Sequence, residues 1–315
     1  MGSDRLLVRE LWRYPVKSMG GERVGSVAVG ERGLHADRLW AVREVERGAT
    51  STARRLPALL QCSARYADDP PADAGPGRPA EAVITFPGGE ELSTADPKAN
   101  DRLTDLVERR VELRPLPPET DKAGFRAPLL TKSEIRRQFD LADDEELPDF
   151  STFPVHKLAQ LARNATPVGT YVDAYPLHLV TVGSLDAMRE LAPGADFDVR
   201  RFRPNVVVEG SGEFEWCGGR LSGPETELEP EIPTVRCSVP VREQPGLEAQ
   251  PDVMRTIKDH SDRCLGVYAN VARTGSLSEG DELTYAGRAE AGAARELGSR
   301  VRRRIVRASL KLMPR

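Results

Sequence analysis

The stretch LLVRELWRYPVKSMGGERVGSVAVGERGLHADRLWAVREV, residues 6–45, decides which fold to expect. Its β-branched, aromatic and aliphatic residues fall into three runs, Leu6 to Val16, Val24 to Val29 and Leu39 to Val45, and glycines at turn-like spacing separate them. β-branched and aromatic residues favour strands, and glycine permits the tight turns between strands. The stretch therefore predicts consecutive strands of a barrel or a sheet.

The same alternation of strands and turns continues outward. Ala82 to Phe86 and Val111 to Arg114 are predicted strands, and the Pro- and Gly-rich stretch 68–79 before them has the composition of a flexible hairpin loop. Leu103, Leu106 and Val107 share one side of a predicted short helix, Ala99 to Glu108.

Beyond a polar, acidic stretch, the second half of the chain is also rich in predicted strands. These are Leu177 to Val182, Val206 to Glu209, Thr234 to Val241, Val267 to Ala272 and Asp281 to Tyr285. A helix that Ser184 caps follows the first of them. We expect a mostly β (α+β) protein with a β-barrel-like domain at 1–116, a polar connection or insertion at 117–170, a β-barrel domain at 171–286 and a basic helix at 287–315.

The last segment differs from the rest in its charge. Residues 287–315 carry nine Lys and Arg residues against two Glu, although the whole chain has a net charge of −4. Apolar residues recur there at helical spacing opposite the arginines, so residues 295–315 could dock on the acidic body of the chain, on an anionic membrane surface or on a partner protein. Nucleic acid is disfavoured because no aromatic residue interleaves the basic ones.

Several familiar classes of protein lack their motifs here. The four cysteines form no CxxC pair and the four histidines no HxxxH or HExxH pair, which disfavours disulfide scaffolds, zinc ribbons and zinc hydrolases. The chain has no GxSxG, Walker or Rossmann motif. It also has neither an apolar run of the ~18 residues that a membrane span needs nor the layout of a signal peptide, so we expect a cytoplasmic protein.

Cys237, in PTVRC (233–237), is the candidate functional thiol. It follows Arg236 within the predicted strand, and a neighbouring guanidinium favours the thiolate that metals and electrophiles require. The residues alone favour the alternative, a small buried apolar side chain, because a lone cysteine more often has that role than that of a ligand.

Basic residues in several motifs form a candidate anion site. RRFRPN (200–205) places three arginines before a strand, and Pro204 is expected to hold Arg203 extended with its side chain outward. Arginine forks bind phosphate in a bidentate manner, and Lys17 and Ser18 of YPVKS could add a charge and a hydroxyl. Arg38 and Arg54 could bind the same phosphate, and ordinary ion pairs remain the alternative for every residue of this set.

Taken together, six motifs resemble those of MOSC (molybdenum cofactor sulfurase C-terminal) proteins that carry an N-terminal MOSC β-barrel domain. In chain order they are LWRYPVKSMGG (11–21), GLHADRLWAV (33–42), TARR (52–55), RRFRPNVVV (200–208), PTVRC and LGVYANVARTGSLSEGDEL (265–283). The resemblance implies a protein similar to the mitochondrial amidoxime-reducing component and its bacterial relatives, which bind molybdenum–molybdopterin and reduce N-hydroxylated compounds.

The resemblance also implies roles for individual residues. Cys237 would ligate molybdenum and be catalytic, and the residues that would bind the pterin and its phosphate are Lys17, Ser18, Arg38, Arg54, Ser184, Arg203, Asn205 and Arg236. After the cysteine, the reductase relatives continue with a Thr-Thr-Val-Asp-Pro-like stretch, whereas this chain has SVPVREQPGL (238–247). Val239 to Gln244 therefore offers neither that Thr nor that Asp.

Three functions follow as hypotheses. The first is a molybdenum oxidoreductase that acts on N-oxygenated small molecules, and it needs electrons from a ferredoxin or flavoprotein partner because the chain has no flavin or iron–sulfur motif. The second is a sulfur carrier or transferase with a persulfide on Cys237, and the third is a cofactor-binding protein without turnover.

Overall fold

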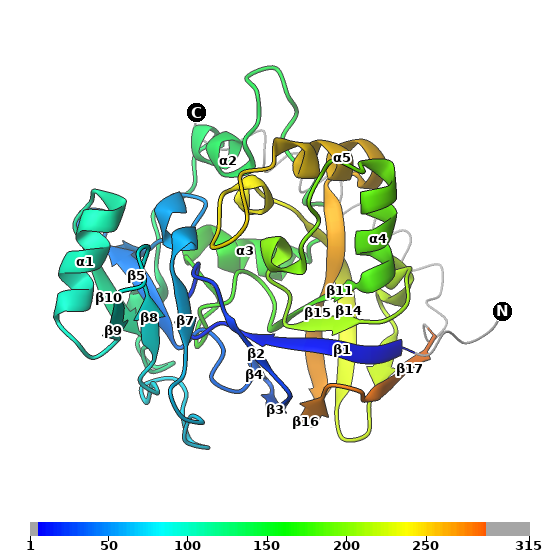
Figure 1. Ribbon diagram of the computed structural model, residues 1–315, viewed down its shortest axis with the longest axis horizontal. Coiled ribbons are helices and arrows are strands. Elements are labelled where there is room, and N and C mark those ends of the chain that lie inside the picture. Colours follow the sequence, from blue (N-terminus) through cyan, green and yellow to red (C-terminus); the bar gives the residue numbers. More distant parts are fainter. Residues whose placement is uncertain (1–5, 288–315) are drawn as a thin grey trace.

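The computed structural model describes residues 6–287. The predicted basic helix at 287–315 lies outside these residues except for Gly287. Within the described range, a closed barrel forms one side of the molecule and three smaller sheets accompany it (Figure 1).

Seven strands make the barrel, in the order β1, β12, β11, β15, β14, β13, β17 and back to β1. Their bounds are β1 Leu6–Arg13, β11 Leu177–Thr181, β12 Val206–Val208, β13 Arg220–Ser222, β14 Glu227–Val235, β15 Cys264–Arg273 and β17 Glu282–Ala286. β1 closes the ring because it pairs with β12 on one edge and with β17 on the other. A closed barrel leaves no unpaired strand edge along this ring.

The pattern of side chains explains why these segments form a barrel. Along β14, every second residue is buried, but a β-bulge at Pro230/Ile232 interrupts the strand. Successive side chains of a strand point to opposite faces, so Leu228 lies in the cluster inside the barrel, whereas Ile232, beyond the bulge, packs in a different cluster with Phe153 and Tyr175. Leu11, Val206 and the other inward residues form one buried apolar cluster.

The first third of the chain adds three small sheets that border the barrel. Their strands are β3 Ser26–Gly30, β4 Gly33–Leu34 and β16 Gly275–Ser278 in one sheet, β5 Trp40–Glu44, β6 Ala49–Thr50 and β10 Val111–Pro115 in the second, and β7 Ser63–Arg65, β8 Val83–Thr85 and β9 Glu91–Ser93 in the third. β2 Glu22–Val24 pairs with β1. A separate core, which includes Leu59, Ile84 and Leu103, holds the second and third sheets and α1 together, whereas the first sheet packs in the core cluster of the barrel.

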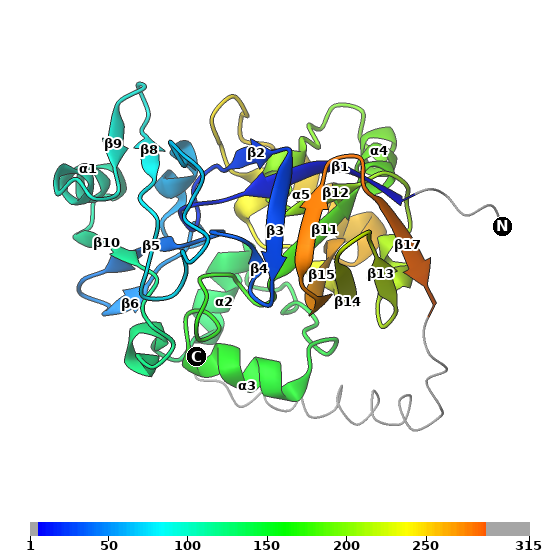
Figure 2. The same ribbon diagram turned by 90° about the horizontal axis from the view of Figure 1, so that it is seen from below.

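Short helices complete the structure. They are α1 Lys98–Val107, α2 Lys132–Phe139, α3 Val155–Arg163, α4 Val182–Leu191 and α5 Pro251–Ser261, with 3-10 turns η1 Pro57–Gln61, η2 Lys122–Phe125, η3 Val199–Phe202, η4 Glu213–Trp216 and η5 Val239–Val241. In Figure 2, α3 lies beside the barrel along the lower edge of the view. None of the helices in residues 6–287 is long and apolar enough to cross a membrane.

The structure confirms the expected mostly β (α+β) class with a β-barrel, and it corrects three details. The predicted strand Thr234 to Val241 ends at Val235, because Val239–Val241 forms η5. Thr181, not Ser184, caps α4, since the Thr181 side chain accepts a hydrogen bond from the Ser184 backbone N–H. The stretch 117–170 contains η2, α2 and α3, which its polar composition did not indicate.

Closure of the barrel by β1 should be essential for stability. Leu11 is fully buried in β1, so Leu11→Ala should lower the free energy of unfolding by about 2–5 kcal/mol through lost burial and a residual cavity. The matched control is Leu129→Ala, because Leu129 is 66% exposed. Urea unfolding followed by circular dichroism measures both variants, and equal midpoints for the two would contradict the closure by β1.

Candidate functional site

One open cavity contains eight of the nine residues that the sequence nominated. They are Lys17, Ser18, Arg38, Arg54, Arg203, Asn205, Arg236 and Cys237. The cavity has a volume of about 100 Å³ and is lined by residues from both halves of the chain. Ser184 is not among its lining residues; its hydroxyl donates to the buried carboxylate of Glu213 at 2.5 Å.

Backbone hydrogen bonds bring the two N-terminal motifs of the site together. The Lys17 N–H donates to the Trp40 carbonyl at 2.8 Å, and the Arg38 N–H donates to the Tyr14 carbonyl at 2.7 Å. Ser18 and Arg38 both have left-handed backbone conformations, with φ of 73° and 55°. Such conformations are costly for residues with side chains and tend to occur at functional sites, so the surrounding structure must hold them in place.

Two guanidinium groups lie against the ring of Tyr14. The Arg203 guanidinium is 4.4 Å and that of Arg38 5.1 Å from the centre of the Tyr14 ring, and the Tyr14 hydroxyl donates to the Pro204 carbonyl at 2.9 Å. Burial raises the pKa of Tyr14 far above its ordinary value, so the hydroxyl stays neutral. The ring thereby supports two cations that would otherwise repel each other.

The prediction that Arg203 is extended and points outward is wrong. Arg203 ends η3 in a left-handed conformation with φ of 54°, and its guanidinium donates to the Met19 carbonyl. The following proline disfavours the right-handed helical region and leaves this alternative open. Arg201 of the same motif is also fully buried and pairs with Asp196 at 2.9 Å.

Positive charge exceeds negative charge in the cavity. Five cationic side chains line it, and Asp173 is the only carboxylate among its described lining residues. Asp173 pairs with Lys17 at 2.5 Å and with Arg54 at 3.4 Å. Outside the lining, Asp37 pairs with Arg38, which still leaves a surplus of cations.

Buried donors in the cavity also lack partners. Arg203 Nη2 and Arg236 Nε make no hydrogen bond within the described part of the chain. An unpaired buried donor costs about 1–3 kcal/mol. Together with the cation surplus, these donors fit an anionic ligand with several acceptor oxygens.

The charges of the site follow from burial and from one another. Burial lowers the pKa of Lys17 to about 8, although Asp173 counteracts part of this effect. Burial would raise the pKa of Asp173, but the charges of Lys17 and Arg54 outweigh it and hold that pKa well below its usual range. Burial likewise lowers the pKa of Arg203 to about 10. At neutral pH, Asp173 is therefore ionised and Lys17 is mostly protonated.

Arg236 is buried against a neutral histidine. Its Nη1 lies 3.2 Å from His178 Nε2, and its Nη2 donates to the Phe202 carbonyl at 2.9 Å. Burial, together with the Arg236 charge, lowers the pKa of His178 well below its ordinary value. The ring is therefore neutral, and its Nε2 accepts from Arg236.

Cys237 follows the end of β14 and lies in an irregular segment, not in the strand that the sequence predicted. It is half-buried, packs against Ala53, Leu60 and Val239, and lines the cavity. Residues 6–287 contain no group of three or more His, Cys, Asp and Glu side chains that could hold a metal ion. A metal at Cys237 would therefore need most of its ligands from a bound cofactor.

Sequence reasoning did not nominate several polar and aromatic residues of the cavity. Asp173, His178, Tyr268 and Phe139 line it, yet none of them stands in a recognisable catalytic spacing. For Asp173 the available signal was a single carboxylate within the apolar stretch YVDAYPLHLV (171–180). Phe139 comes from the stretch 117–170, whose functional content appeared low from its composition.

Comparisons with known proteins give consistent matches. Residues 167–284 match the model of the MOSC domain, and residues 5–115 match that of the MOSC N-terminal beta barrel domain. Mitochondrial amidoxime reducing component 2 of Bos taurus is 25% identical over an alignment of 303 residues. The alignment covers 88% of this chain and 82% of that protein.

The solved structures that match this chain include two bacterial proteins. The YuaD protein from Bacillus subtilis has a TM-score of 0.43 and 12% identity, covering 90% of this chain and 97% of that one. YiiM from Geobacillus stearothermophilus has a TM-score of 0.31 and 21% identity, covering 38% of this chain and 57% of that one.

Anion binding in the cavity should depend on the protonation of Lys17. Because the Lys17 pKa is about 8, sulfate affinity should fall by about tenfold between pH 7 and pH 9 as the buried cation is lost. Sulfate keeps its own charge over this range, and isothermal titration calorimetry measures its binding. Lys17→Arg should remove the inflection because arginine stays charged, and an inflection that persists in this variant would refute the role of Lys17.

The four cysteines should differ in reactivity. Cys237 lines an open cavity, whereas Cys62 is fully buried and burial raises the pKa of Cys62 to about 12 and that of Cys264 to about 11. Iodoacetamide at pH 8 should therefore modify Cys237 about tenfold faster than Cys62, with Cys264 between them. Time-resolved peptide mass spectrometry gives these rates, and equal rates for Cys62 and Cys237 would contradict the described cavity.

Proposed function

Because the chain belongs to the MOSC family and combines a MOSC domain with the MOSC N-terminal β-barrel domain, we propose that it binds molybdenum–molybdopterin in the Cys237 cavity and reduces N-oxygenated small molecules. The observation that carries this proposal is the placement of a lone thiol beside a surplus of buried cations. The amidoxime-reducing function in the name of the bovine relative supports the choice of substrate class.

The residues of the cavity fit such a cofactor. A phosphate offers acceptor oxygens to Lys17 and to the unpaired Arg203 Nη2, and the free Arg236 Nε suits a further acceptor on the pterin. A thiolate such as that of Cys237 is a suitable ligand for a metal–dithiolene unit. The volume of about 100 Å³, roughly that of three water molecules, accommodates the phosphate end, so the rest of the cofactor would extend through the open mouth.

When bound, the metal would supply two-electron redox chemistry at the end of the Cys237 side chain. Asp173 remains ionised because Lys17 and Arg54 stabilise its charge, so its half-exposed carboxylate can accept a hydrogen bond from an N–H or O–H group of the substrate. Phe139 and Val239 give the same cavity an apolar wall that excludes water. We further propose that electrons come from a ferredoxin-type or flavoprotein-type partner.

Metal content and turnover test this function together. The chain, purified from a host that makes molybdopterin, should contain about one molybdenum per chain, as expected for one thiolate ligand, and should reduce benzamidoxime with reduced methyl viologen as electron donor. Cys237→Ala should lose both properties. The matched control Cys264→Ala should keep both, because Cys264 does not line the cavity.

The alternative functions give different results in the same experiment. A wild-type chain without molybdenum that carries one additional sulfur atom on Cys237 would favour sulfur transfer and overturn the proposal. Molybdenum without turnover of any N-oxygenated compound would reduce the function to cofactor binding. Full activity of Cys237→Ala would exclude the thiolate as a metal ligand.

A further inference from the structure

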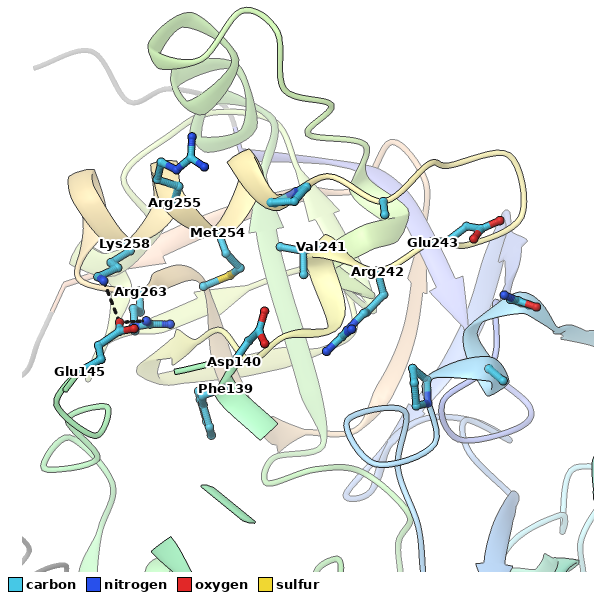
Figure 3. A pocket seen from close by; sticks show the side chains of 15 residues that line it. Phe139, Asp140, Glu145, Val241, Arg242, Glu243, Met254, Arg255, Lys258 and Arg263 are labelled. Carbon is cyan, nitrogen blue, oxygen red and sulfur yellow. Dashed lines mark hydrogen bonds and ion pairs between the residues drawn. The ribbon is translucent and has the colours of Figure 1, made fainter. Parts of the chain in front are cut away.

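A second concave site lies next to the cavity and takes no part in the proposed chemistry. This α2–α5 groove has a volume of about 680 Å³ and is formed by the end of α2, by η5, by α5 and by η1 (Figure 3). Phe139 lines both the groove and the Cys237 cavity. Its volume is within the range of small-molecule sites in proteins.

The middle of the groove combines an apolar wall with one carboxylate. Val241, Met254 and Phe139 lie between the charged residues at the two sides of the view in Figure 3, and Asp140 lies among them. An apolar surface in a concavity of this size favours a ligand with a rigid hydrocarbon or aromatic body.

The charges at the two sides are balanced differently. On one side, a single oxygen of Glu145 accepts from Lys258 at 2.8 Å and also pairs with Arg263. On the other side, the guanidinium of Arg242 makes no hydrogen bond or ion pair with any residue in the described range. Arg242 is only partly exposed, so a carboxylate bound there would be partly desolvated.

Carboxylates of the groove limit the charge of its ligand. Asp140 and Glu243 line it in addition to Glu145, against the four cations Arg242, Arg255, Lys258 and Arg263. Arg255 pairs with Asp252, which does not line the groove, so the other three cations and the three carboxylates balance in number. Because Arg242 is the cation that has no partner among the described residues, the groove matches a ligand with one negative charge and disfavours a multiply charged one.

The wall that carries Arg242 is held in place by a buried side chain. The Arg201 guanidinium donates to the carbonyls of Pro240 and Glu248, at 3.3 and 2.9 Å, and to that of Arg242 at 3.5 Å. Arg201 is itself fully buried. The groove is thus preformed, and a preformed site loses less entropy when its ligand binds.

We propose that the α2–α5 groove binds a small molecule with an apolar body of about two rings and one anionic group, which Arg242 holds. The ligand would lie against the segment that directly follows Cys237. This inference does not depend on the presence of molybdenum, and it assigns the groove a role separate from that of the cofactor cavity.

Biphenyl-4-carboxylate is a suitable probe, and the neutral biphenyl-4-carboxamide is its matched control. With methyl-¹³C-methionine labelling of the full chain, the carboxylate should shift the Met254 methyl resonance, assigned through Met254→Leu, and leave that of buried Met188 unchanged. Arg242→Gln should weaken binding of the carboxylate about fivefold and that of the carboxamide less than twofold, as expected for a partly exposed ion pair.

Arg255→Gln is the control variant, because Arg255 lines the same groove but pairs with Asp252 at 2.6 Å and is largely exposed. It should leave both affinities within twofold of the wild type. A probe that shifts the Met19 resonance but not that of Met254 would be bound near the cofactor cavity and would overturn the proposal. Absence of binding, or equal effects of the two arginine variants, would overturn it as well.

Discussion

The site depends on buried positive charge that the protein does not fully neutralise. Lys17, Arg203 and Arg236 are buried. Among the described residues that line the cavity, Asp173 is the only carboxylate that balances the charge of these three and of the two other cations. Burying a charge without a partner is costly, so the rest of the fold must supply the free energy that holds these groups in place. Closure of the barrel by β1 contributes directly, because β1 leads into Tyr14 and Lys17 while its neighbour β12 follows Arg203 and Asn205. The ring of Tyr14 then contacts two of the guanidinium groups. An anionic ligand would relieve the remaining repulsion.

The sequence could predict the chemical types at this site but not their geometry. Strand alternation and glycine spacing indicated the β-rich class, and the motifs around Lys17, Arg203 and Cys237 nominated residues that the fold brings into one cavity. The left-handed conformations of Ser18, Arg38 and Arg203 could not be predicted, because such conformations depend on tertiary contacts and not on residue type. Ser184 was misplaced because a serine near a helix start resembles a cap, whereas Thr181 performs that role here. Asp173 has no local motif, and its importance becomes apparent only through the partners that the fold gives it. The division of the chain into domains stays a prediction. β1, which belongs to the predicted domain 1–116, is nevertheless a strand of the barrel, where it pairs with β12 and β17.

The segment after Cys237 connects the two concave sites. SVPVREQPGL lacks the Thr and Asp of the reductase relatives, and in their place it supplies Val239 to the cofactor cavity and Arg242 to the α2–α5 groove. Arg201, buried beneath this segment, fixes its carbonyl groups and thereby the position of both walls. The segment 117–170 reaches the same place through Phe139, and the Gln138 carbonyl accepts from the Ser238 N–H at 3.1 Å. Sequence changes in either segment would therefore alter the two concave sites without changing the residues that we propose to hold the cofactor.

We propose that Cys237 binds molybdenum inside a cavity whose buried cations suit an anionic ligand. X-ray absorption at the molybdenum K-edge counts the sulfur neighbours of the metal directly. If the Cys237 thiolate is a ligand, Cys237→Ser should have one sulfur neighbour fewer than the wild-type chain, with the remaining sulfur neighbours unchanged. An identical number of sulfur neighbours in the two proteins would show that Cys237 is not a ligand of the metal.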